Sequence, residues 1–322
     1  MPPIELKIII LLIAGFYLLI KGADFLVKGS SSLAKRLNVR EIVIGLTLVA
    51  FGTSMPETFV NIISSIGNRN EIVFGNIIGS NIFNILIILG ISGLVRPLLV
   101  NRNTLFREIP FSLFAAVLLF FLVNDAALFG FGENKLSSLD GLVFMVFFAV
   151  FLLYVARISK EKTRHKLDVQ IYPATRTWAY ILIGFFALFV GAKLTVDSSV
   201  ELARFFGVSE KLIALTIIAG GTSLPELAAS SVAAFKKEYD LAIGNIIGSN
   251  IFNILFILGI SAFIRPAAYN LAFNMDILVL ALSSIFLFLA VYLHPDKKLG
   301  RLQSCLFLVL YAVYILYLLY RK

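Results

Sequence analysis

The sequence predicts an all-α membrane protein whose ten transmembrane helices form two inverted five-helix repeats, with the second and seventh helices broken. Its composition, its long apolar segments and an internal repeat support this fold class. Of the 322 residues, 59% are hydrophobic and only 15% are charged. Soluble domains are usually about half apolar and a quarter charged, so a chain of this composition is expected to bury its apolar surface against lipid.

Ten segments are long and apolar enough to be membrane helices, because a helix needs about 20 apolar residues to cross a bilayer. The first lacks the basic stretch and the cleavage site of a signal peptide, so we expect it to remain as a helix. The predicted division is a first half at 1–160, a cytoplasmic linker at 161–176 and a second half at 177–322. The ten segments lie at roughly 6–27, 41–66, 72–95, 107–124, 139–156, 177–199, 210–235, 241–264, 272–293 and 302–320.

The basic residues predict the orientation of these helices. If the N-terminus lies outside, the 28 Lys and Arg residues favour the cytoplasmic loops by about two to one. We therefore expect a multi-pass protein of the plasma (inner) membrane with both termini extracytoplasmic. The same bias accounts for the net charge of +9 without nucleic acid as a partner. Membrane lipids are the expected surroundings, and an oligomer is not required.

An internal repeat is the strongest organisational signal in the sequence. Gly75–Ser92 reads GNIIGSNIFNILIILGIS, and Gly244–Ser261 repeats it with a single change, at Ile87. The same offset of 169 residues places GTSMPE, which ends at Glu57, on GTSLPE. This offset spans five predicted helices, an odd number, so the second half must enter the membrane from the opposite side. Two halves inverted in this way form the architecture of many secondary transporters.

Two acidic residues fall deep inside the predicted membrane segments. Glu57 and Glu226 lie near the centres of the second and seventh helices, whereas the other seventeen acids fall in loops or near helix ends. A carboxylate at that depth costs several kcal/mol unless it is paired or neutralised. No Lys or Arg is predicted at comparable depth, so the partner is a proton or a transported cation. The alternative is a pair of permanently protonated, hydrogen-bonded glutamates.

Each of these glutamates follows a proline. Pro56 and Pro225 lack an N–H group and clash with the preceding turn, so we expect both helices to break there. The break frees backbone carbonyls near Thr53 and Thr222, which membrane depth tolerates only where they line a cavity.

Serine and asparagine pairs on the third and eighth helices add further oxygen atoms. Ser80 and Asn84 are four residues apart, as are Ser249 and Asn253, so each pair shares one helix face. The amides can serve as ligands for a hard cation or as hydrogen-bonding groups between helices. The GxxxG spacings that begin at Gly75 and Gly244 predict close helix packing.

An all-oxygen site with two negative charges favours calcium over magnesium. Calcium takes about 6–8 oxygen ligands in flexible geometry, whereas magnesium requires near-octahedral geometry and dehydrates reluctantly. Two glutamates supply up to four oxygens, the freed carbonyls supply more, and water can fill the rest.

The doubled motifs, GTSMPE and GTSLPE each followed by GNIIGSNIFN, resemble the paired repeats of sodium/calcium exchangers in the cation/calcium antiporter superfamily, in particular prokaryotic members without a regulatory domain. The resemblance implies a calcium site from Glu57, Glu226 and the carbonyls of Thr53 and Thr222. It also implies sodium sites that share the glutamates, and first and sixth helices that slide across the rest. The further residues implied as sodium ligands or supports are Ala50, Ser54, Ser80, Asn84, Ala219, Ser223, Ser249 and Asn253. Many members carry an aspartate at the position of Asn253, so any potassium requirement stays open.

The sequence therefore predicts a secondary antiporter that exchanges Na⁺ for Ca²⁺ and normally exports Ca²⁺, with no cofactor. Proton-coupled or K⁺-dependent antiport on the same scaffold remains the alternative. An intramembrane enzyme is disfavoured, because the chain has no GxSxG motif and no deep histidine. A passive channel would not need matched inverted halves.

Overall fold

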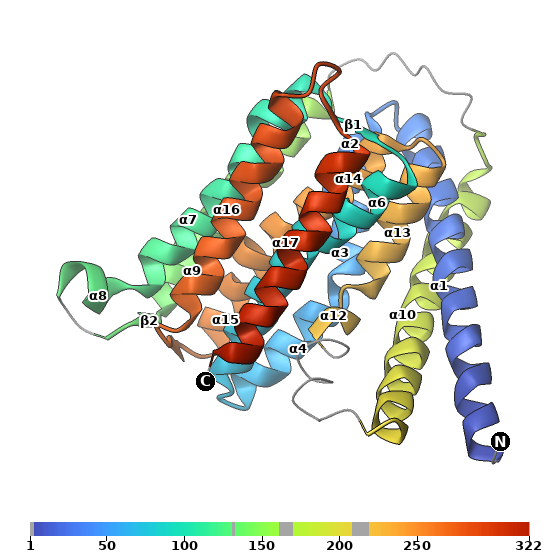
Figure 1. The fold of residues 1–322 in the computed structure, drawn as a ribbon. Coiled ribbons are helices and arrows are strands. Elements are labelled where there is room, and N and C mark those ends of the chain that lie inside the picture. The colour runs from blue at the N-terminus through green and yellow to red at the C-terminus, as the bar shows by residue number, and fades with distance from the viewer. Residues whose placement is uncertain (1–2, 131–132, 161–169, 208–218, 322) are drawn as a thin grey trace.

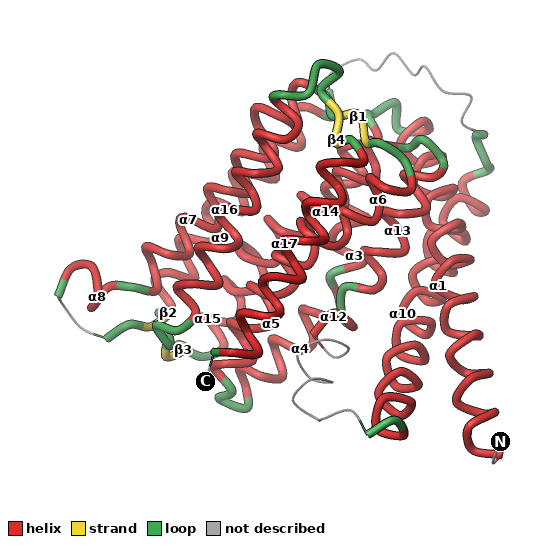
Figure 2. Tube along the Cα trace, in the orientation of Figure 1, coloured by secondary structure: helices red, strands yellow, loops and turns green. Residues whose placement is uncertain are grey.

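A computed structural model describes residues 3–130, 133–160, 170–207 and 219–321, and almost all of its regular structure is helical (Figures 1 and 2). The first half contains α1 (Pro3–Arg36), α2 (Glu41–Ile44), α3 (Ala50–Thr53), α4 (Met55–Ile66), α5 (Asn70–Phe83), α6 (Leu89–Val95), β1 (Leu98–Leu99), α7 (Ile109–Val123), α8 (Asp125–Phe129), β2 (Lys135–Leu136) and α9 (Ser138–Ile158). The second half contains α10 (Ala174–Phe205), α12 (Ala219–Gly221), α13 (Leu224–Phe235), α14 (Tyr239–Ile251), α15 (Gly259–Ile264), β3 (Ala267–Ala268), α16 (Phe273–Tyr292), β4 (Lys298–Leu299) and α17 (Arg301–Tyr320). Within the described residues, four π-helical turns join or extend these helices, namely η1 (Gly45–Val49), η2 (Asn84–Ile88), η3 (Thr104–Glu108) and η5 (Phe252–Leu258).

The described helices match the predicted membrane spans. Eight of them are long and apolar enough to cross a membrane. A ninth span is the pair Glu41–Thr53 and Met55–Ile66, which is bent by 48°. The predicted seventh helix, 210–235, begins outside the described residues, and its described part is α12 and α13. The spans Asn70–Val95 and Tyr239–Ile264 are the most buried of the eight, so the repeated motifs form the centre of the bundle.

The two halves run in opposite directions. β1 and β3 are related by the same offset of 169 residues, yet they lie at opposite ends of the molecule (Figure 2). β1 pairs with β4 at one end, and β2 pairs with β3 at the other, both antiparallel. The contacts of the broken helices are also exchanged, because α4 packs on α5 and α15 whereas α13 packs on α14 and α6. The predicted inverted repeat is therefore confirmed.

α1 and α10 form a long helix pair at one side of the bundle (Figure 1). Glycines at a spacing of seven line their contact: Gly15, Gly22 and Gly29 on α1, and Gly184 and Gly191 on α10. A Cβ atom built on Gly22 would lie 2.9 Å from the Gly184 carbonyl oxygen, so the two backbones touch directly. Small residues permit this approach in membrane proteins, where van der Waals packing drives helix association.

α10 also lies against both broken helices. A Cβ on Gly52 would fall 2.0 Å from the ring of Phe185, and one on Gly221 would fall 2.6 Å from Val196. Both partners are on α10, and Gly52 and Gly221 are equivalent by the repeat. The first residue of each GTS motif is therefore glycine because α10 occupies the space of a side chain.

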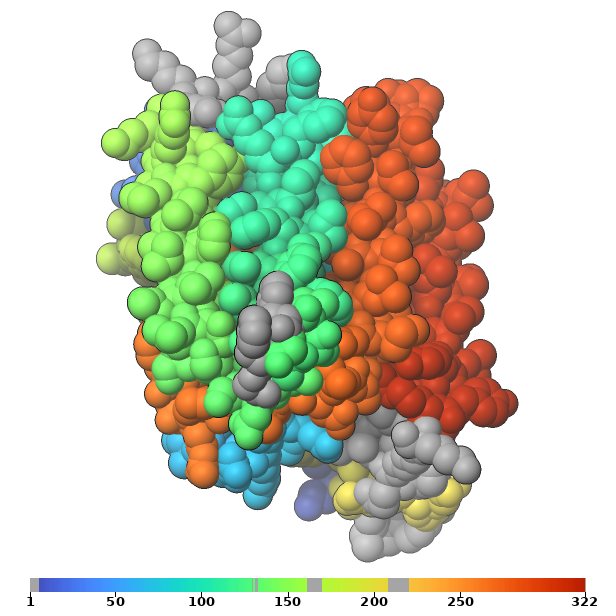
Figure 3. Space-filling view, turned by 90° about the vertical axis from the view of Figure 1, so that its left-hand side faces the viewer, coloured from blue at the N-terminus to red at the C-terminus, as the bar shows by residue number. Residues whose placement is uncertain are grey.

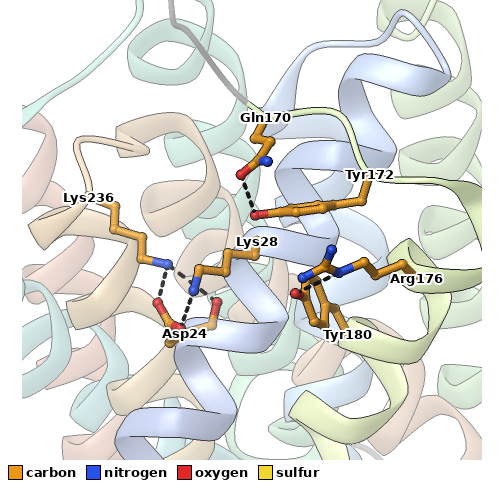
Figure 4. Close-up of polar contacts among 7 residues, drawn as sticks. All are labelled: Asp24, Lys28, Gln170, Tyr172, Arg176, Tyr180 and Lys236. Atoms are coloured by element: carbon orange, nitrogen blue, oxygen red, sulfur yellow. Dashed lines mark hydrogen bonds and ion pairs between the residues drawn. The ribbon is translucent and has the colours of Figure 1, made fainter.

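An ionic contact joins α1 to the end of α13 (Figure 4). Lys236, which follows α13, forms an ion pair with Asp24 and donates to the Asp24 carbonyl oxygen at 3.3 Å. Lys28 donates to the same carboxylate at 2.7 Å. The predicted first segment, 6–27, puts Asp24 near a helix end, but the structure contradicts this because α1 extends twelve residues beyond Asp24 to Arg36. α1 continues to Arg36 because its last turns pack on α10 and α2 instead of ending at the apolar boundary.

We expect Gly22→Ala to lower the thermal stability of the purified protein, because the added methyl group meets backbone atoms that cannot rotate away. Overpacking of this kind usually costs about 1–3 kcal/mol. Gly79→Ala is the matched control, since nothing lies within 4 Å of a Cβ built there. Thermal unfolding in detergent measures both variants. Equal melting temperatures for the two would contradict the tight contact between α1 and α10.

Candidate functional site

The two deep glutamates lie in the first turns of α4 and α13, directly after a break in each span. Pro56 cannot donate a hydrogen bond to the carbonyl four residues earlier, that of Gly52, so the helix that ends at Thr53 does not continue unbroken. Ser54 fills the break with φ −81° and ψ 10°, and Ser223 repeats this geometry with φ −90° and ψ 7°. The predicted breaks are therefore present, and each glutamate sits at a positive helix N-terminus, which favours a carboxylate.

Serines from opposite halves connect the two carboxylates. Ser54 donates to Glu226 Oε1 at 3.0 Å, and Ser223 donates to Glu57 Oε1 at 3.0 Å. Ser80 adds a third donor to Glu57 Oε1 at 3.3 Å. Both glutamates are 1% exposed. The inverted repeat thus brings the two carboxylates to one buried place, each bonded to the serine that precedes the other by three residues.

Several buried oxygen atoms around these carboxylates have no hydrogen-bond partner. In the described part of the chain, neither glutamate forms an ion pair with Lys or Arg. Buried polar groups are nearly always satisfied, so each exception requires an explanation. The unpartnered atoms on the repeated motifs are Glu57 Oε2, Glu226 Oε2, Asn84 Oδ1, Asn253 Oδ1, Thr222 Oγ1, Ser249 Oγ and Ser261 Oγ.

Asparagines hold the two central spans together. Asn84 Nδ2 donates to Asn250 Oδ1 at 2.9 Å, and its repeat equivalent Asn253 donates to Asn81 Oδ1 at 2.9 Å. Asn81 and Asn250 also donate to each other's carbonyl oxygens. The sequence left open whether Asn84 and Asn253 act as ligands or as links between helices. The structure shows that their amide nitrogens link the helices while their amide oxygens stay free.

The remaining predicted residues lie on the same elements. Ala50 begins α3, and its carbonyl oxygen accepts from the Ser54 amide at 3.0 Å. Thr53 is fully buried, whereas Thr222 is partly exposed. Ala219 begins α12, and its side chain lies outside the described residues.

The GxxxG prediction holds in one half only. A Cβ on Gly248 would lie 2.8 Å from Leu46 Cα, so α14 packs closely on η1. Gly75 would meet only the ring of Phe273, at 3.7 Å, and Gly79 would meet nothing within 4 Å. The first spacing therefore faces a cavity instead of a helix.

Sequence reasoning missed a second set of amides behind the site. Asn76 donates to Asn61 Oδ1 at 2.7 Å and to the Glu57 carbonyl oxygen at 3.3 Å. In the other half, Asn245 donates to Ser230 at 2.9 Å. Their positions in the repeated GNIIGSNIFN motif were the signal that could have identified them, since a packed apolar core does not need repeated asparagines.

The pseudo-symmetry is broken at the two threonines. Thr53 Oγ1 lies 3.1 Å from Asn245 Oδ1, which closes this side of the site. Thr222 instead borders two cavities of about 620 Å³ each, which also share Val60. One is bounded by α4 and α10, and the other by α5, α16 and α17. The second includes Arg321, so it lies toward the end of the molecule where α17 ends, and neither cavity is lined by Glu57 or Glu226.

Comparison with known proteins agrees with this geometry. A family model described as "Sodium/calcium exchanger protein" matches residues 7–157 and 176–320. The inner membrane protein YrbG of Escherichia coli (strain K12) is 36% identical, over 94% of this chain and 95% of that protein. The sodium/calcium exchanger MaX1 of Methanosarcina acetivorans is 30% identical, over 97% of this chain and 98% of that protein.

A solved structure extends the agreement to the whole fold. The sodium-calcium exchanger NCX_Mj, soaked with 10 mM Na⁺ and zero Ca²⁺, superposes with a TM-score of 0.80 at 31% identity and covers 97% of this chain and 98% of that chain. The match includes both inverted halves that supply the paired glutamates. This chain therefore belongs to the sodium/calcium exchanger family, as a multi-pass membrane transporter and not an enzyme.

Proposed function

We propose that this protein exchanges Na⁺ for Ca²⁺ by alternating access and that Glu57 and Glu226 bind the transported cations. The observation that carries the proposal is the pair of buried carboxylates, each with one unpartnered oxygen and no basic partner among the described residues. Burying two such charges costs several kcal/mol unless a positive charge compensates them. One divalent cation or several monovalent cations supply that charge, which makes occupation by the two ions mutually exclusive.

The oxygen atoms left without partners fit the demands of calcium. Each glutamate keeps Oε2 available, and the amide oxygens of Asn84 and Asn253 add neutral ligands. The carbonyls of Thr53 and Thr222 lie at the helix breaks and complete the proposed calcium set. Ala50, Ser54, Ser80, Ala219, Ser223 and Ser249 are the proposed sodium ligands or supports. An all-oxygen set with flexible geometry suits calcium, whereas magnesium requires a rigid octahedron.

The asymmetry of the two threonines supports alternating access. Thr222 borders two cavities, whereas Thr53 is fully buried and bonded to Asn245, although the two positions are equivalent by the repeat. Exchange of these two environments would open the other side of the membrane without a change of fold. We place both chain ends outside the cell, so the described state opens to the exterior of a plasma (inner) membrane.

Reconstituted vesicles should take up ⁴⁵Ca²⁺ when they are loaded with Na⁺ and diluted into Na⁺-free buffer. Uptake should follow the sodium gradient, because both ions require the same carboxylates. Gradients of K⁺ and H⁺ imposed separately, each without sodium, are the controls. Uptake driven by the pH gradient and unaffected by sodium would reject sodium coupling in favour of proton/calcium antiport.

Glu57→Gln and Glu226→Gln should each abolish this uptake while leaving the protein folded. Loss of a residue that only supports a metal ligand costs about 10–100-fold in affinity, so loss of a charged ligand should cost more. Glu133→Gln is the matched control, because the side chain of Glu133 is 82% exposed, on a loop. Normal exchange by either membrane variant would overturn the site assignment.

Asn253→Ala should weaken calcium affinity by about tenfold, because it removes both a free oxygen and a link between helices. Asn81→Ala removes the acceptor of that link but no unpartnered oxygen. We therefore expect both variants to lose thermal stability and Asn253→Ala to lose more affinity. Calcium titration of flux distinguishes them, and equal affinities would assign Asn253 a purely structural role.

A further inference from the structure

Another cavity, with both charged and aromatic lining residues, lies between the start of α7 and the end of α9. Its volume is about 440 Å³, and it is lined by Arg107, Glu108, Phe111, Phe151, Tyr154, Arg157 and Ile158. Figure 3 shows α9 and α7 side by side on the face turned to the viewer, with α16 next to α7. Large apolar side chains such as Phe114, Val150 and Leu153 are exposed on these helices, so this face contacts lipid.

Glu108 is the unusual residue of this cavity. It is 1% exposed, and its Oε1 accepts a hydrogen bond from the Tyr154 hydroxyl, but its Oε2 has no partner. It is also the last residue of the π-helical turn η3. Such turns occur frequently at functional sites; η2 and η5 lie within the repeated motifs of the cation site, and η1 ends directly before Ala50, one of its predicted residues. η3 lies outside those motifs, so a different role has to explain it.

The opposite end of the molecule contains a closed version of the same arrangement. On α16, Asp276 is 2% exposed, and its two carboxylate oxygens accept from Tyr314 at 3.0 Å and from Arg321 at 2.9 Å. Here an acid, a tyrosine and an arginine satisfy each other completely. Around Glu108 the acid and the tyrosine are joined, but the exposed Arg107 and Arg157 border the cavity without an ion pair to Glu108 in the described structure.

We propose that this cavity binds the headgroup of an ethanolamine phospholipid. The two guanidinium groups match the phosphate, which arginine binds through paired hydrogen bonds. The free Glu108 Oε2 matches the primary ammonium group, which has three N–H donors. The stacked rings of Phe111 and Phe151, with centroids 5.5 Å apart, form an apolar wall for the glycerol backbone.

The charges select this headgroup over others. Basic pockets between membrane helices bind anionic lipids, but an anionic headgroup would place its charge against the buried Glu108 carboxylate. A phosphatidylcholine headgroup has no N–H donor for Glu108 Oε2. A headgroup needs both a phosphate and a primary ammonium to satisfy the two bases and the acid together. Phosphatidylserine has both, but its additional carboxylate would be repelled by the buried Glu108 carboxylate.

Native mass spectrometry of the delipidated full chain tests the proposal, with phosphatidylethanolamine, phosphatidylcholine and phosphatidylglycerol of the same acyl chains. We expect the wild type to retain phosphatidylethanolamine about tenfold better than the other two, the factor of one charge-assisted hydrogen bond. Glu108→Gln should remove this preference and raise the retention of phosphatidylglycerol. Asp276→Asn is the matched control and should leave the preference unchanged, because the Asp276 carboxylate is already satisfied within the protein.

A second variant keeps the proposal testable if Glu108→Gln does not fold. Arg107→Gln combined with Arg157→Gln changes only exposed side chains and should reduce retention of both phosphatidylethanolamine and phosphatidylglycerol. The proposal is overturned if the wild type retains the three lipids equally, if Glu108→Gln keeps the wild-type preference, or if the double arginine variant retains phosphatidylethanolamine as well as the wild type does. Because the readout is lipid retention, it does not depend on which cations the protein transports.

Discussion

The structure depends on two carboxylates that face a common buried place from opposite halves of the chain. Ser54 and Ser223 cross-link Glu226 and Glu57, so neither half can hold its glutamate correctly without the other. The membrane makes this arrangement costly, because there is no water to solvate the charges. The helix breaks, the serines and the asparagines around the two glutamates position these charges and supply polar groups close to them.

The asparagines provide the rigid part of that arrangement. Asn81, Asn84, Asn250 and Asn253 form a closed set of hydrogen bonds between the two central spans, and each bond is worth more when no water competes for it. The side-chain amides of Asn84 and Asn253 have two roles. Their nitrogen atoms donate hydrogen bonds that link the helices, and their oxygen atoms remain without a partner. A buried polar network of this kind fixes one register of the two spans, because a shift along either helix would break several hydrogen bonds at once.

The helix pair α1 and α10 contrasts with this core. Its helix α10 touches the broken helices at Gly52 and Gly221, where the missing side chains leave room for Phe185 and Val196. Its ionic contact with α13, through Asp24 and Lys236, lies at one end only. Lys193, the repeat equivalent of Asp24, instead pairs with Asp197 on its own helix. The pair is therefore joined to α13 by an ion pair at one end, and α10 borders a cavity that also includes Thr222.

The sequence alone determined the fold class, the inverted repeat, the broken helices and the paired glutamates. Composition, a repeat offset that spans an odd number of helices, and the backbone chemistry of proline can all be read from residue identity. Three features required the tertiary structure. The length of α1, and with it the depth of Asp24, depends on packing against α10; the different roles of Gly79 and Gly248 depend on which helix lies opposite. The different roles of the amide nitrogen and oxygen in Asn84 and Asn253 depend on hydrogen-bond partners 166 and 172 residues away in the chain. No local pattern encodes such contacts, since they arise only when the two inverted halves meet.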